Sequence, residues 1–544
     1  MTSTGISPAV RVPGESRGDE PVAVRRRSIA RRLAGGGEPD RWWGWLTILI
    51  ITAIGGILRF WHLGRPPYLV FDETYYVKWA DSMWRYGYER ATALKNDEAD
   101  KLWNAGNHDV WSDKADFVVH PPLGKWLIGI GEHLFGVGDS FGWRFVSAVL
   151  GTLSILMLGR IARRMFRSNL IGATAALLLA VDGQHFVHSR TGLLDIQVMF
   201  WALAAFGALV IDRDVGRARL ATRTAGQIDG APGLLANFGP GLGIRWWRLV
   251  AAVCLGACCG TKWSGIWFVA VFGLMTVFWD IGARRATGAR RWLSTGLFRD
   301  GASAALTMLP VTVIVYLMTW TGWFLSKDGY DRTWAGDHPA AGLGRLVPDA
   351  LRSLWFYHSQ MWTANVNLKP GHSFESHPYS WIVVGRPVLF DWRSYEQGQN
   401  GCTLASKCEI AIIDLGNPLI WWGATLALPV ALAMWMLARD WRVGAALAGV
   451  AAGWCPWFLF SERTIFDFYA VAFVPYVVLI DVYMLAMILG PPGASPRRRR
   501  IGGMVAGGLV TLTVALFVWF HPILSDQLIS PMNLQDRIWI PTWR

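Results

Sequence analysis

Two neighbouring carboxylates, Asp72 and Glu73, open the first long polar segment that follows an apolar stretch. Tyr and Trp residues recur behind them at helical spacing, which predicts a helix resting on the membrane surface. A carboxylate fixed at this level could act as a general base that accepts a proton from a hydroxyl. Asp72 could instead serve as the N-cap of the helix, with Glu73 favoured in its first turn. The two interpretations are compatible, because an N-cap carboxylate is oriented and kept ionised.

Further charged residues occur at the ends of apolar stretches. Arg144, Arg190 and Lys262 are placed in this way, and Asp182 and Asp195 accompany them. Charges at a membrane edge are costly and often belong to a site, although each one alone could be a snorkelling side chain or a cap. Cations at one level could bind a phosphate, and Arg does so through two hydrogen bonds. We expect the three cations to bind an anion, with Asp195 fixing Arg190 and Asp182 nearby.

Two polar-aromatic segments could complete such a site. His120 precedes two prolines and Lys125, which predicts the start of an interfacial helix whose lysine either reaches a phosphate or snorkels. His377, Tyr379 and Trp381 lie in a later loop that could cover the site or receive an acceptor. A packed structural loop is the simpler interpretation of that second segment.

No residues have the spacing of a metal-ligand set, so we expect no required metal or other cofactor. Asp72, Glu73 and Asp195 could bind a divalent ion only weakly. Six cysteines include no CxxC motif, and Cys402 and Cys408 fall in a polar loop that we place outside the cytoplasm. Disulfides persist there, so these two cysteines could close a small loop, although the sequence leaves this open.

Composition indicates an integral membrane protein. Apolar residues make up 53% of the 544-residue chain, and its mean hydropathy is +0.29. Both values are too high for one soluble domain of this size. A net charge of +13 could suggest nucleic acid, but the basic residues lie between apolar stretches and therefore indicate membrane orientation. We expect the membrane as a partner and no nucleic acid.

Eleven stretches are long enough to cross a bilayer core of about 30 Å. They are placed near residues 43–61, 142–159, 170–188, 191–211, 248–262, 264–281, 301–320, 418–438, 443–460, 466–489 and 502–520. The segment 121–136 could be a twelfth, but it is short and charged. If it lies in the interface, the Arg-dense short loops all fall on one side, which is the cytoplasmic side. We therefore predict a cytoplasmic N-terminus and an external C-terminus.

These predictions divide an all-α chain into five parts. Residues 1–41 form a disordered, Arg-rich cytoplasmic tail without the apolar core of a signal peptide. Residues 42–320 form a catalytic membrane module that includes a first external loop, 62–141. A second large external loop, 321–417, precedes the C-terminal spans at 418–520 and an external tail at 521–544. Both large loops are aromatic-rich and are expected to contain interfacial helices.

The chain resembles the protein O-mannosyltransferases, which are multi-span glycosyltransferases of the GT-C type that use polyprenyl-phosphate sugars. The resemblance rests on motifs that occur in order along most of the chain: Phe71-Asp72-Glu73-Thr74-Tyr75-Tyr76, His120-Pro121-Pro122-Leu123-Gly124-Lys125, Arg144, Ser189-Arg190 with Leu193-Leu194-Asp195, Lys262-Trp263-Ser264-Gly265, and His377-Pro378-Tyr379-Ser380-Trp381. Eukaryotic members carry a β-trefoil domain in the second loop. That loop is too short here, so the chain resembles the shorter bacterial type.

The resemblance implies transfer of mannose from polyprenyl-phosphate mannose to Ser or Thr hydroxyls of exported polypeptides, near the secretion channel. It implies a bacterial plasma membrane, with the active site on its external side. Asp72 would be the base, and Arg144, Lys262 and Arg190 would stabilise the leaving phosphate. Direct attack opposite the phosphate would invert C1. Two alternatives stay open: a related transferase that modifies a glycan or lipid, and a transporter, which would need charges near the span centres.

Overall fold

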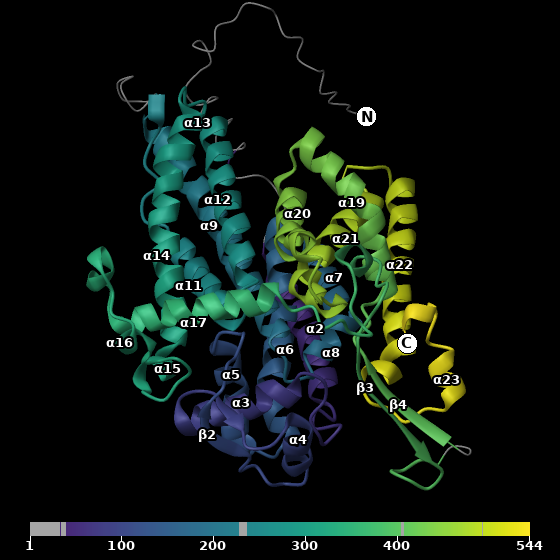
Figure 1. The fold of residues 1–544 in the computed structure, drawn as a ribbon. Helices are drawn as coiled ribbons and strands as arrows, with labels where there is room; N and C mark the ends of the chain where they lie inside the picture. The colour runs from purple at the N-terminus through teal and green to yellow at the C-terminus, as the bar shows by residue number, and fades with distance from the viewer. Residues whose placement is uncertain (1–32, 34–39, 228–236, 404–406, 492, 544) are drawn as a thin grey trace, which may run out of the picture. The chain divides into compact units, whose positions relative to one another are not determined.

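Helices make up most of the chain, as the apolar stretches predict (Figure 1). The structure is a computed structural model that describes residues 33, 40–227, 237–403, 407–491 and 493–543. Apart from residues 33, 40 and 41, the predicted disordered tail 1–41 lies outside the described residues. The protein is a multi-pass membrane protein, because its long apolar helices can satisfy every backbone polar group within the bilayer.

Nine helical segments within the described ranges are long and apolar enough to span a membrane. Five are single helices: α2 (Trp42–Phe60), α6 (Ser140–Phe166), α12 (Gly265–Thr287), α19 (Pro418–Ala438) and α22 (Pro496–Leu524). A sixth is the apolar part of α9 (Asp195–Gln227). The remaining three combine elements: α13 (Trp292–Ser294), η1 (Thr295–Asp300) and α14 (Gly301–Thr319); α20 (Trp441–Trp454) and η3 (Cys455–Phe460); η4 (Asp467–Phe473) and α21 (Val474–Leu489).

Two shorter apolar helices, α7 (Asn169–Ala180) and α11 (Trp246–Thr261), coincide with the other predicted spans. The exact count of eleven stays a prediction. The single helix expected at 170–188 is interrupted, because Asp182 starts a new helix, α8 (Gly183–His188). Its carboxylate accepts the backbone N–H of His185 at 2.9 Å, which satisfies a helix N-terminus in the middle of an apolar stretch.

The first large loop region, residues 62–141, contains the predicted helix α3 (Glu73–Tyr86). It continues through β1 (Arg90–Thr92), α4 (Asn96–Asn104), β2 (Trp111–Ala115) and α5 (Leu123–Phe135). With 13 residues, α5 would extend only about 20 Å and is too short to cross a bilayer core. Its placement in the interface therefore stays the preferred prediction. α5 packs on both α3 and α6 and so holds this region against the membrane helices.

The second large loop region, residues 321–417, contains the amphipathic helix α17 (Asp349–Val366), which runs crosswise to α14 (Figure 1). Short helices flank it: α15 (Thr321–Leu325), α16 (Trp334–Asp337), η2 (Gly342–Leu346) and α18 (Pro378–Trp381). The C-terminal tail adds α23 (Pro531–Gln535) and η5 (Pro541–Trp543).

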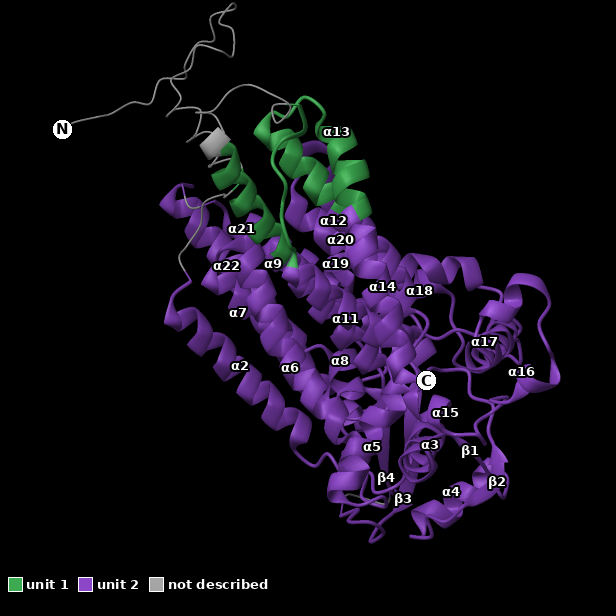
Figure 2. Cartoon of the chain, turned by 90° about the vertical axis from the view of Figure 1, so that its left-hand side faces the viewer, with its two compact units in different colours: residues 1–36, 212–245, 277–302 green, residues 37–211, 246–276, 303–544 purple. Residues whose placement is uncertain are grey.

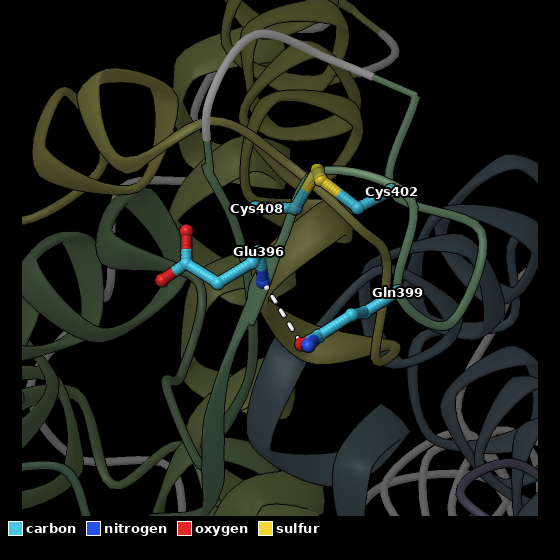
Figure 3. The surroundings of a disulfide bond; sticks show 4 residues. All are labelled: Glu396, Gln399, Cys402 and Cys408. Carbon is cyan, nitrogen blue, oxygen red and sulfur yellow. Dashed lines mark hydrogen bonds between the residues drawn. A yellow bond between two sulfur atoms is a disulfide. The ribbon is translucent and has the colours of Figure 1, made fainter.

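Two small antiparallel sheets were not foreseen in the all-α prediction. The first pairs β1 with β2, and the second pairs β3 (Leu389–Glu396) with β4 (Lys407–Ile413). A disulfide joins Cys402 to Cys408 beside the tip of the second hairpin (Figure 3). The sequence left open whether these two cysteines are bonded, and the structure shows that they are.

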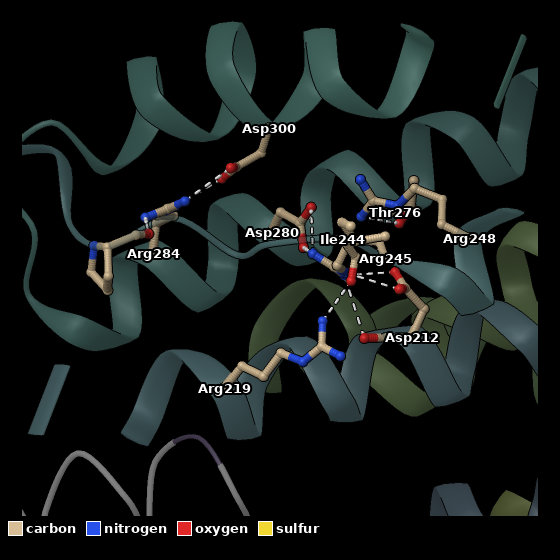
Figure 4. A network of polar contacts seen from close by, with 10 residues as sticks. Asp212, Arg219, Ile244, Arg245, Arg248, Thr276, Asp280, Arg284 and Asp300 are labelled. Carbon is tan, nitrogen blue, oxygen red and sulfur yellow. Dashed lines mark hydrogen bonds and ion pairs between the residues drawn. The ribbon is translucent and has the colours of Figure 1, made fainter. Parts of the chain in front are cut away.

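The described chain divides into two compact units (Figure 2). Residues 1–36, 212–245 and 277–302 form unit 1, and residues 37–211, 246–276 and 303–544 form unit 2. Unit 1 contains a buried ion network in which Arg245 contacts Asp212 at 2.6 Å and Asp280 at 3.3 Å (Figure 4). Arg284 pairs with Asp300 at 2.8 Å in the same unit. The domain boundaries predicted from sequence stay predictions.

Within unit 2, close helix packing surrounds α6 and α21. α6 packs on α2, α5 and α7, whereas α21 packs on α7, α19, α20 and α22. Small residues allow the closest approach: a Cβ atom on Gly172 of α7 would lie 2.9 Å from the carbonyl oxygen of Gly159 in α6. Small residues at such crossings are typical of membrane helices. This closely packed bundle supports the large loops that carry much of the candidate site.

Candidate active site

Asp72 lies directly before α3, and its side chain does not cap the helix. The N-cap alternative is therefore wrong for the carboxylate. The nearest donor is the Tyr76 hydroxyl, which donates to Oδ2 across a long 3.5 Å. Burial raises the pKa of Asp72 to about 6, and the charge of Asp195 adds to this, while Lys262 acts in the opposite direction. An ionised carboxylate with few partners is well suited to accept a proton.

Lys262 and Asp195 form a buried ion pair, with Nζ 2.8 and 3.0 Å from the two carboxylate oxygens. Lys262 lies in the turn between α11 and α12, and Asp195 is the first residue of α9. The lysine Nζ also lies 5.0 Å from the centre of the Tyr469 ring. Burial alone would lower the pKa of Lys262, but Asp195 outweighs it and raises that pKa. The cation thus remains charged at the site, and Asp195 fixes Lys262 rather than Arg190.

Glu73 is held by Arg144 inside the protein. Arg144 donates from Nε to Oε1 and from Nη2 to Oε2, both at 2.8 Å. The same carboxylate accepts the backbone N–H of Gly192 at 2.7 Å and of Val70 at 3.0 Å. Both ionic side chains are almost fully buried, with 0% and 1% exposed. Glu73 therefore anchors the loop before α3 to α6, and it has no free oxygen for a proton from a substrate.

Arg144 also donates to backbone carbonyls, reaching Pro66 at 2.9 Å and Tyr68 at 3.1 Å. The guanidinium of Arg144 is thus already bonded to protein groups, whereas the sequence analysis predicted that it would bind a phosphate. Arg190 is similar, because its Nη1 reaches the carbonyls of Arg59 and Trp61 at 2.8 and 2.7 Å. Burial lowers the pKa of Arg190 to about 10, and the charge of Arg144 contributes. Both arginines brace backbone segments, and sequence alone could not reveal these carbonyl partners.

Lys125 likewise has protein partners. Its Nζ lies 2.7 Å from Glu89 Oε1 and donates to the carbonyl of His120, also at 2.7 Å. Burial lowers the pKa of Lys125, whereas Glu89 opposes this change. The lysine thereby fixes the backbone at His120, whose ring centre lies 6.0 Å from that of Tyr76. Burial, together with the charges of Lys262 and Lys125, lowers the pKa of His120 well below normal, so the ring is neutral.

Asp182 lies apart from this arrangement. Besides capping α8, it accepts the backbone N–H of Asn417 at 3.1 Å and the indole N–H of Trp421 at 3.0 Å. Asp182 therefore joins α8 to the start of α19, which is a structural contact and not the supporting site role that the sequence suggested.

The segment containing His377, Tyr379 and Trp381 forms the short helix α18. His377 accepts the backbone N–H of Tyr379 at 3.4 Å, and 66% of Tyr379 is exposed. Trp381 is buried, and its ring centre lies 6.0 Å from that of Tyr469. The structure therefore packs this loop behind a residue of the site, while its predicted acceptor role stays untested.

A cavity of about 890 Å³ opens beside Lys262 and Asp195. Its polar wall includes His120, Asn365, Arg463 and Tyr469, and its apolar wall is formed by residues of α12, α14 and α17. Asp72 is not among the lining residues, but its pKa responds to both Lys262 and Asp195. The cavity thus combines charged and polar side chains with many apolar ones, which would fit an amphipathic ligand with an anionic head.

Arg463 was not predicted as a site residue. Its Nε is buried without a hydrogen-bond partner in the described structure, and Nη1 reaches Asn365 only at 3.5 Å. The guanidinium lies 5.9 Å from the ring centre of Trp457. A buried donor that lacks a partner is costly unless a ligand supplies one. In the sequence, Arg463 lies close to Glu462 and Asp467, which are plausible ion-pair partners, so its residue type alone gives no signal of a site role.

His358 forms a second polar contact on the cavity wall. Its Nδ1 faces the carbonyl of Leu354 at 2.7 Å, so Nε2 accepts the hydroxyl of Tyr316 at 2.5 Å. The indole N–H of Trp263 donates to the same hydroxyl at 3.0 Å. Burial lowers the pKa of His358 to about 4, which keeps its ring neutral. This chain of hydrogen bonds fixes α17 against α14.

Among the described residues, no group of three or more His, Cys, Asp or Glu side chains is arranged to hold a metal ion. Two of the three carboxylates considered as weak divalent ligands are engaged elsewhere, since Glu73 pairs with Arg144 and Asp195 with Lys262. The expectation that no metal is required stays untested.

Comparison with known proteins decides the family. The chain is 38% identical over 520 residues to a polyprenol-phosphate-mannose–protein mannosyltransferase of Mycolicibacterium smegmatis (strain MKD8), covering 93% of this chain and 94% of that protein. A protein of the same name from Mycobacterium tuberculosis (strain CDC 1551 / Oshkosh) is 37% identical, covering 99% of this chain and all of that protein. The chain belongs to the protein O-mannosyltransferase family. This conclusion confirms the resemblance inferred from the ordered motifs.

Two regions of this protein O-mannosyltransferase family member match family models. Residues 49–214 match the dolichyl-phosphate-mannose-protein mannosyltransferase model. Residues 350–543 match the C-terminal four-transmembrane region of protein O-mannosyltransferase. The solved structure of the S. cerevisiae protein O-mannosyltransferase Pmt1-Pmt2 complex bound to the sugar donor aligns with a TM-score of 0.68 at 15% identity, covering 95% of this chain and 94% of that chain. This similarity confirms the GT-C-type fold.

Asp72, Glu73, Arg144 and Asp195 fall within the first matched region, and Arg463 falls within the second. Lys262 lies between them. Around the cavity, the structure groups Lys262 and Asp195 with Arg463, a cation that the sequence analysis missed. The pairing of Asp195 with Lys262 replaces the predicted pairing with Arg190.

Proposed function

We propose that this protein O-mannosyltransferase family member transfers mannose from polyprenyl-phosphate mannose to Ser or Thr hydroxyls of a polypeptide. The observation that carries this proposal is the cavity beside Lys262, whose wall combines the cations Lys262 and Arg463 with apolar residues of α12, α14 and α17. The relatives that share most of the chain are named as mannosyltransferases of this donor class. A lipid-linked donor has the matching pattern of an anionic head and an apolar tail.

Asp72 would be the general base. A Ser or Thr hydroxyl is a poor nucleophile near neutral pH, so a carboxylate must accept its proton as oxygen attacks C1 of the sugar. A pKa of about 6 suits this task, because the group is mainly ionised at pH 7 yet basic enough to take a proton. Attack on the face opposite the phosphate would invert C1.

The leaving group would be the polyprenyl phosphate. As the bond from C1 to oxygen breaks, negative charge grows on the phosphate, and it departs without the acid that a sugar alkoxide needs. Lys262 and Arg463 would stabilise this charge, since both lie on the cavity wall. Each well-placed donor contributes a few kcal/mol to such a transition state. Arg144 and Arg190 would act indirectly, by holding the backbone that carries the base.

The apolar wall would receive the prenyl chain. Leu309 and Val313 of α14 face the cavity, as does Ile266 of α12. All three side chains are just over half exposed in the protein alone. Exposed apolar residues on membrane helices face lipid, so the groove would admit a lipid-linked donor laterally from the bilayer.

The active site would lie on the external side of a bacterial plasma membrane, near the secretion channel, where unfolded exported chains would be available. The distribution of Arg supports this orientation. A cysteine introduced in place of exposed Asp113 should react with a membrane-impermeant maleimide in intact cells, and one in place of Arg290 should react only after lysis. The opposite pattern would reverse the proposed orientation.

The decisive experiment offers radiolabelled polyprenyl-phosphate mannose and a Ser/Thr-rich peptide to the purified protein. Label should reach the peptide with the wild-type protein and not with Asp72→Asn, whereas both should bind the donor. Asp113→Asn is a matched control, because that aspartate lies in the same loop with its side chain fully exposed. If label instead reached only a glycan or lipid acceptor, the peptide would be the wrong acceptor class. Near-normal transfer by Asp72→Asn would remove Asp72 from the base role.

A further inference from the structure

The strand β3 has one edge paired and one edge free. It pairs with β4 through residues 391–396, in a sheet of only two strands (Figure 1). The outer edge of β4 is partly covered, since Glu409 exchanges backbone hydrogen bonds with Ile529 at 2.8 and 3.0 Å. No strand lies on the other side of β3 in the described structure. An unpaired strand edge is a template on which another extended chain can pair.

The direction of the backbone groups follows from Glu409. Because its N–H and C=O both point to Ile529, they cannot also bond to Ser394, which lies opposite Glu409. The N–H and C=O of Ser394 therefore point away from β4, and by alternation those of Trp392 do so too. Outside the ladder with β4, no backbone group in the described part of the chain bonds to these four groups. At Glu396 the edge is no longer free, because the backbone N–H of this residue already donates to the side-chain oxygen of Gln399 at 3.2 Å (Figure 3).

The inner end of β3 contacts the loop that carries the base. The ring of Phe390 stacks on that of Phe71, with centres 4.5 Å apart and planes within 7°. Phe71 directly precedes Asp72. One residue further along β3, Asp391 accepts the hydroxyl of Tyr68 at 2.7 Å. A chain lying along the free edge would thus pass within a few residues of the proposed reaction centre.

We propose that the acceptor polypeptide binds as an additional β-strand on the edge formed by Trp392 and Ser394, and that this pairing delivers its hydroxyl toward Asp72. The inference rests on the proposed function for the nature of the acceptor. Main-chain pairing suits an extended, unfolded polypeptide, because the bonds do not depend on its side chains. Trp392 is 49% exposed and provides an apolar surface beside the edge. Acceptor choice would then depend on an extended conformation more than on a fixed sequence.

Backbone-methylated peptides test this directly. A strand uses only alternate N–H groups toward its neighbour, so N-methylation of one alternate set should remove the pairing and methylation of the other set should not. With the wild-type protein, we expect KM for the peptide to rise about tenfold for one set and to stay unchanged for the other, as losing one or two such bonds requires. Equal effects of the two sets would overturn the proposal.

Ser394→Pro tests the same edge from the enzyme. Proline removes an N–H that points away from β4, and edge strands tolerate proline at such positions. The variant should bind unmodified peptide about tenfold more weakly, keep its KM for the donor, and lose the difference between the two methylated sets. A folded variant with an unchanged KM for the peptide would overturn the proposal. The donor KM and the thermal unfolding temperature report on folding, and the peptide series stands if the variant does not fold.

Hydrogen exchange separates this inference from the proposed function. The probe is the Ser/Thr-rich peptide added to the wild-type protein without donor. Mannose transfer is measured separately, in the assay with labelled donor. Slower exchange at the amides of Trp392 and Ser394, combined with no transfer to the peptide in that assay, would support docking and overturn the function. Transfer without any slowing at these amides would support the function and overturn docking.

Discussion

At the scale of single residues, the site depends on which charges are already neutralised. Glu73 is neutralised by Arg144, and Asp195 by Lys262. Among the described residues, the carboxylate of Asp72 has only a long contact to the hydroxyl of Tyr76. Adjacent acids in sequence thus have different tasks: one anchors a loop and the other is free to react. The same reasoning distinguishes Arg463, with its unpaired Nε, from Arg144, whose donors are used within the protein.

The raised pKa of Asp72 predicts a pH dependence. The base must be deprotonated, so transfer should be lost as pH falls through the pKa of about 6. At saturating donor, kcat/KM for the peptide should be half-maximal near that pH and fall to about a tenth of its plateau at one pH unit lower. Initial rates across a range of buffered pH values check this. A flat profile across that interval, in protein that stays folded, would argue against Asp72 as the titrating base.

Arg144→Lys should separate anchoring from phosphate binding. Lysine keeps the charge but cannot form the two parallel bonds to Glu73 or reach the carbonyl of Pro66 at the same time. Since weakening a buried ion pair is costly, we expect a loss on the order of 3 kcal/mol in the free energy of unfolding. We also expect a lower kcat, with little change in donor affinity.

Arg463→Lys is the comparison for that experiment, because Arg463 lies on the cavity wall. It should weaken donor binding while the unfolding temperature stays close to that of the wild type. Thermal unfolding in detergent micelles and donor titration measure the two effects. If Arg144→Lys affected donor binding and left stability unchanged, its original assignment as a phosphate ligand would be restored.

At the scale of elements, loops around the site are fixed by a few cross-chain contacts. α3 is held through Glu73, and the hairpin of β3 and β4 contacts the same loop through Phe390 and Phe71. The hairpin is closed beside its tip by the disulfide between Cys402 and Cys408.

Replacing both cysteines by alanine should therefore loosen the hairpin. Removing a short disulfide loop costs about 2 kcal/mol in the chain-entropy description. Because the charged groups of the cavity are elsewhere, we expect a higher KM for the peptide, an unchanged KM for the donor, and a small fall in the unfolding temperature. Equal changes in both KM values would indicate that the hairpin supports the whole site and not the acceptor side.

At the scale of the whole molecule, the candidate site lies entirely within unit 2. α9 and α12 each continue from unit 2 into unit 1 along the chain. Unit 1 has its own buried ion network, in which one guanidinium bridges Asp212 and Asp280 (Figure 4). Stability and catalysis can therefore be perturbed at different places.

Arg245→Met should lower stability without changing the reaction at the site. Its removal takes away the cation that bridges two buried carboxylates, which we expect to cost on the order of 3 kcal/mol. Arg290→Met is a matched control, because Arg290 belongs to the same unit and is exposed. Thermal unfolding and transfer rate per folded molecule measure both effects. A large loss of kcat in folded Arg245→Met protein would contradict this separation.

Much of this arrangement follows from sequence, but partner choice does not. Hydrophobic periodicity and the positions of charges predicted the membrane helices, α3, and the proximity of Asp72, Lys262 and Asp195. They could not predict that Arg144 and Arg190 would be satisfied by backbone carbonyls, because those partners are brought in by tertiary packing. Residues 389–396 alternate only in part and lie in the second large loop, for which the sequence predicts only interfacial helices, so it does not predict the free strand edge.

The pairing of Lys262 with Asp195 has a consequence for selectivity. When the cavity is empty, the positive charge is already balanced at 2.8 Å by a carboxylate of the same protein. A small anion dissolved in water gains little by competing with that carboxylate, since it would lose its own hydration. A phosphate attached to a prenyl chain gains additional binding free energy, because the chain is buried against the apolar wall of the cavity. Soluble sugar phosphates should thus be poor inhibitors, because binding would require the hydrocarbon chain as well as the phosphate.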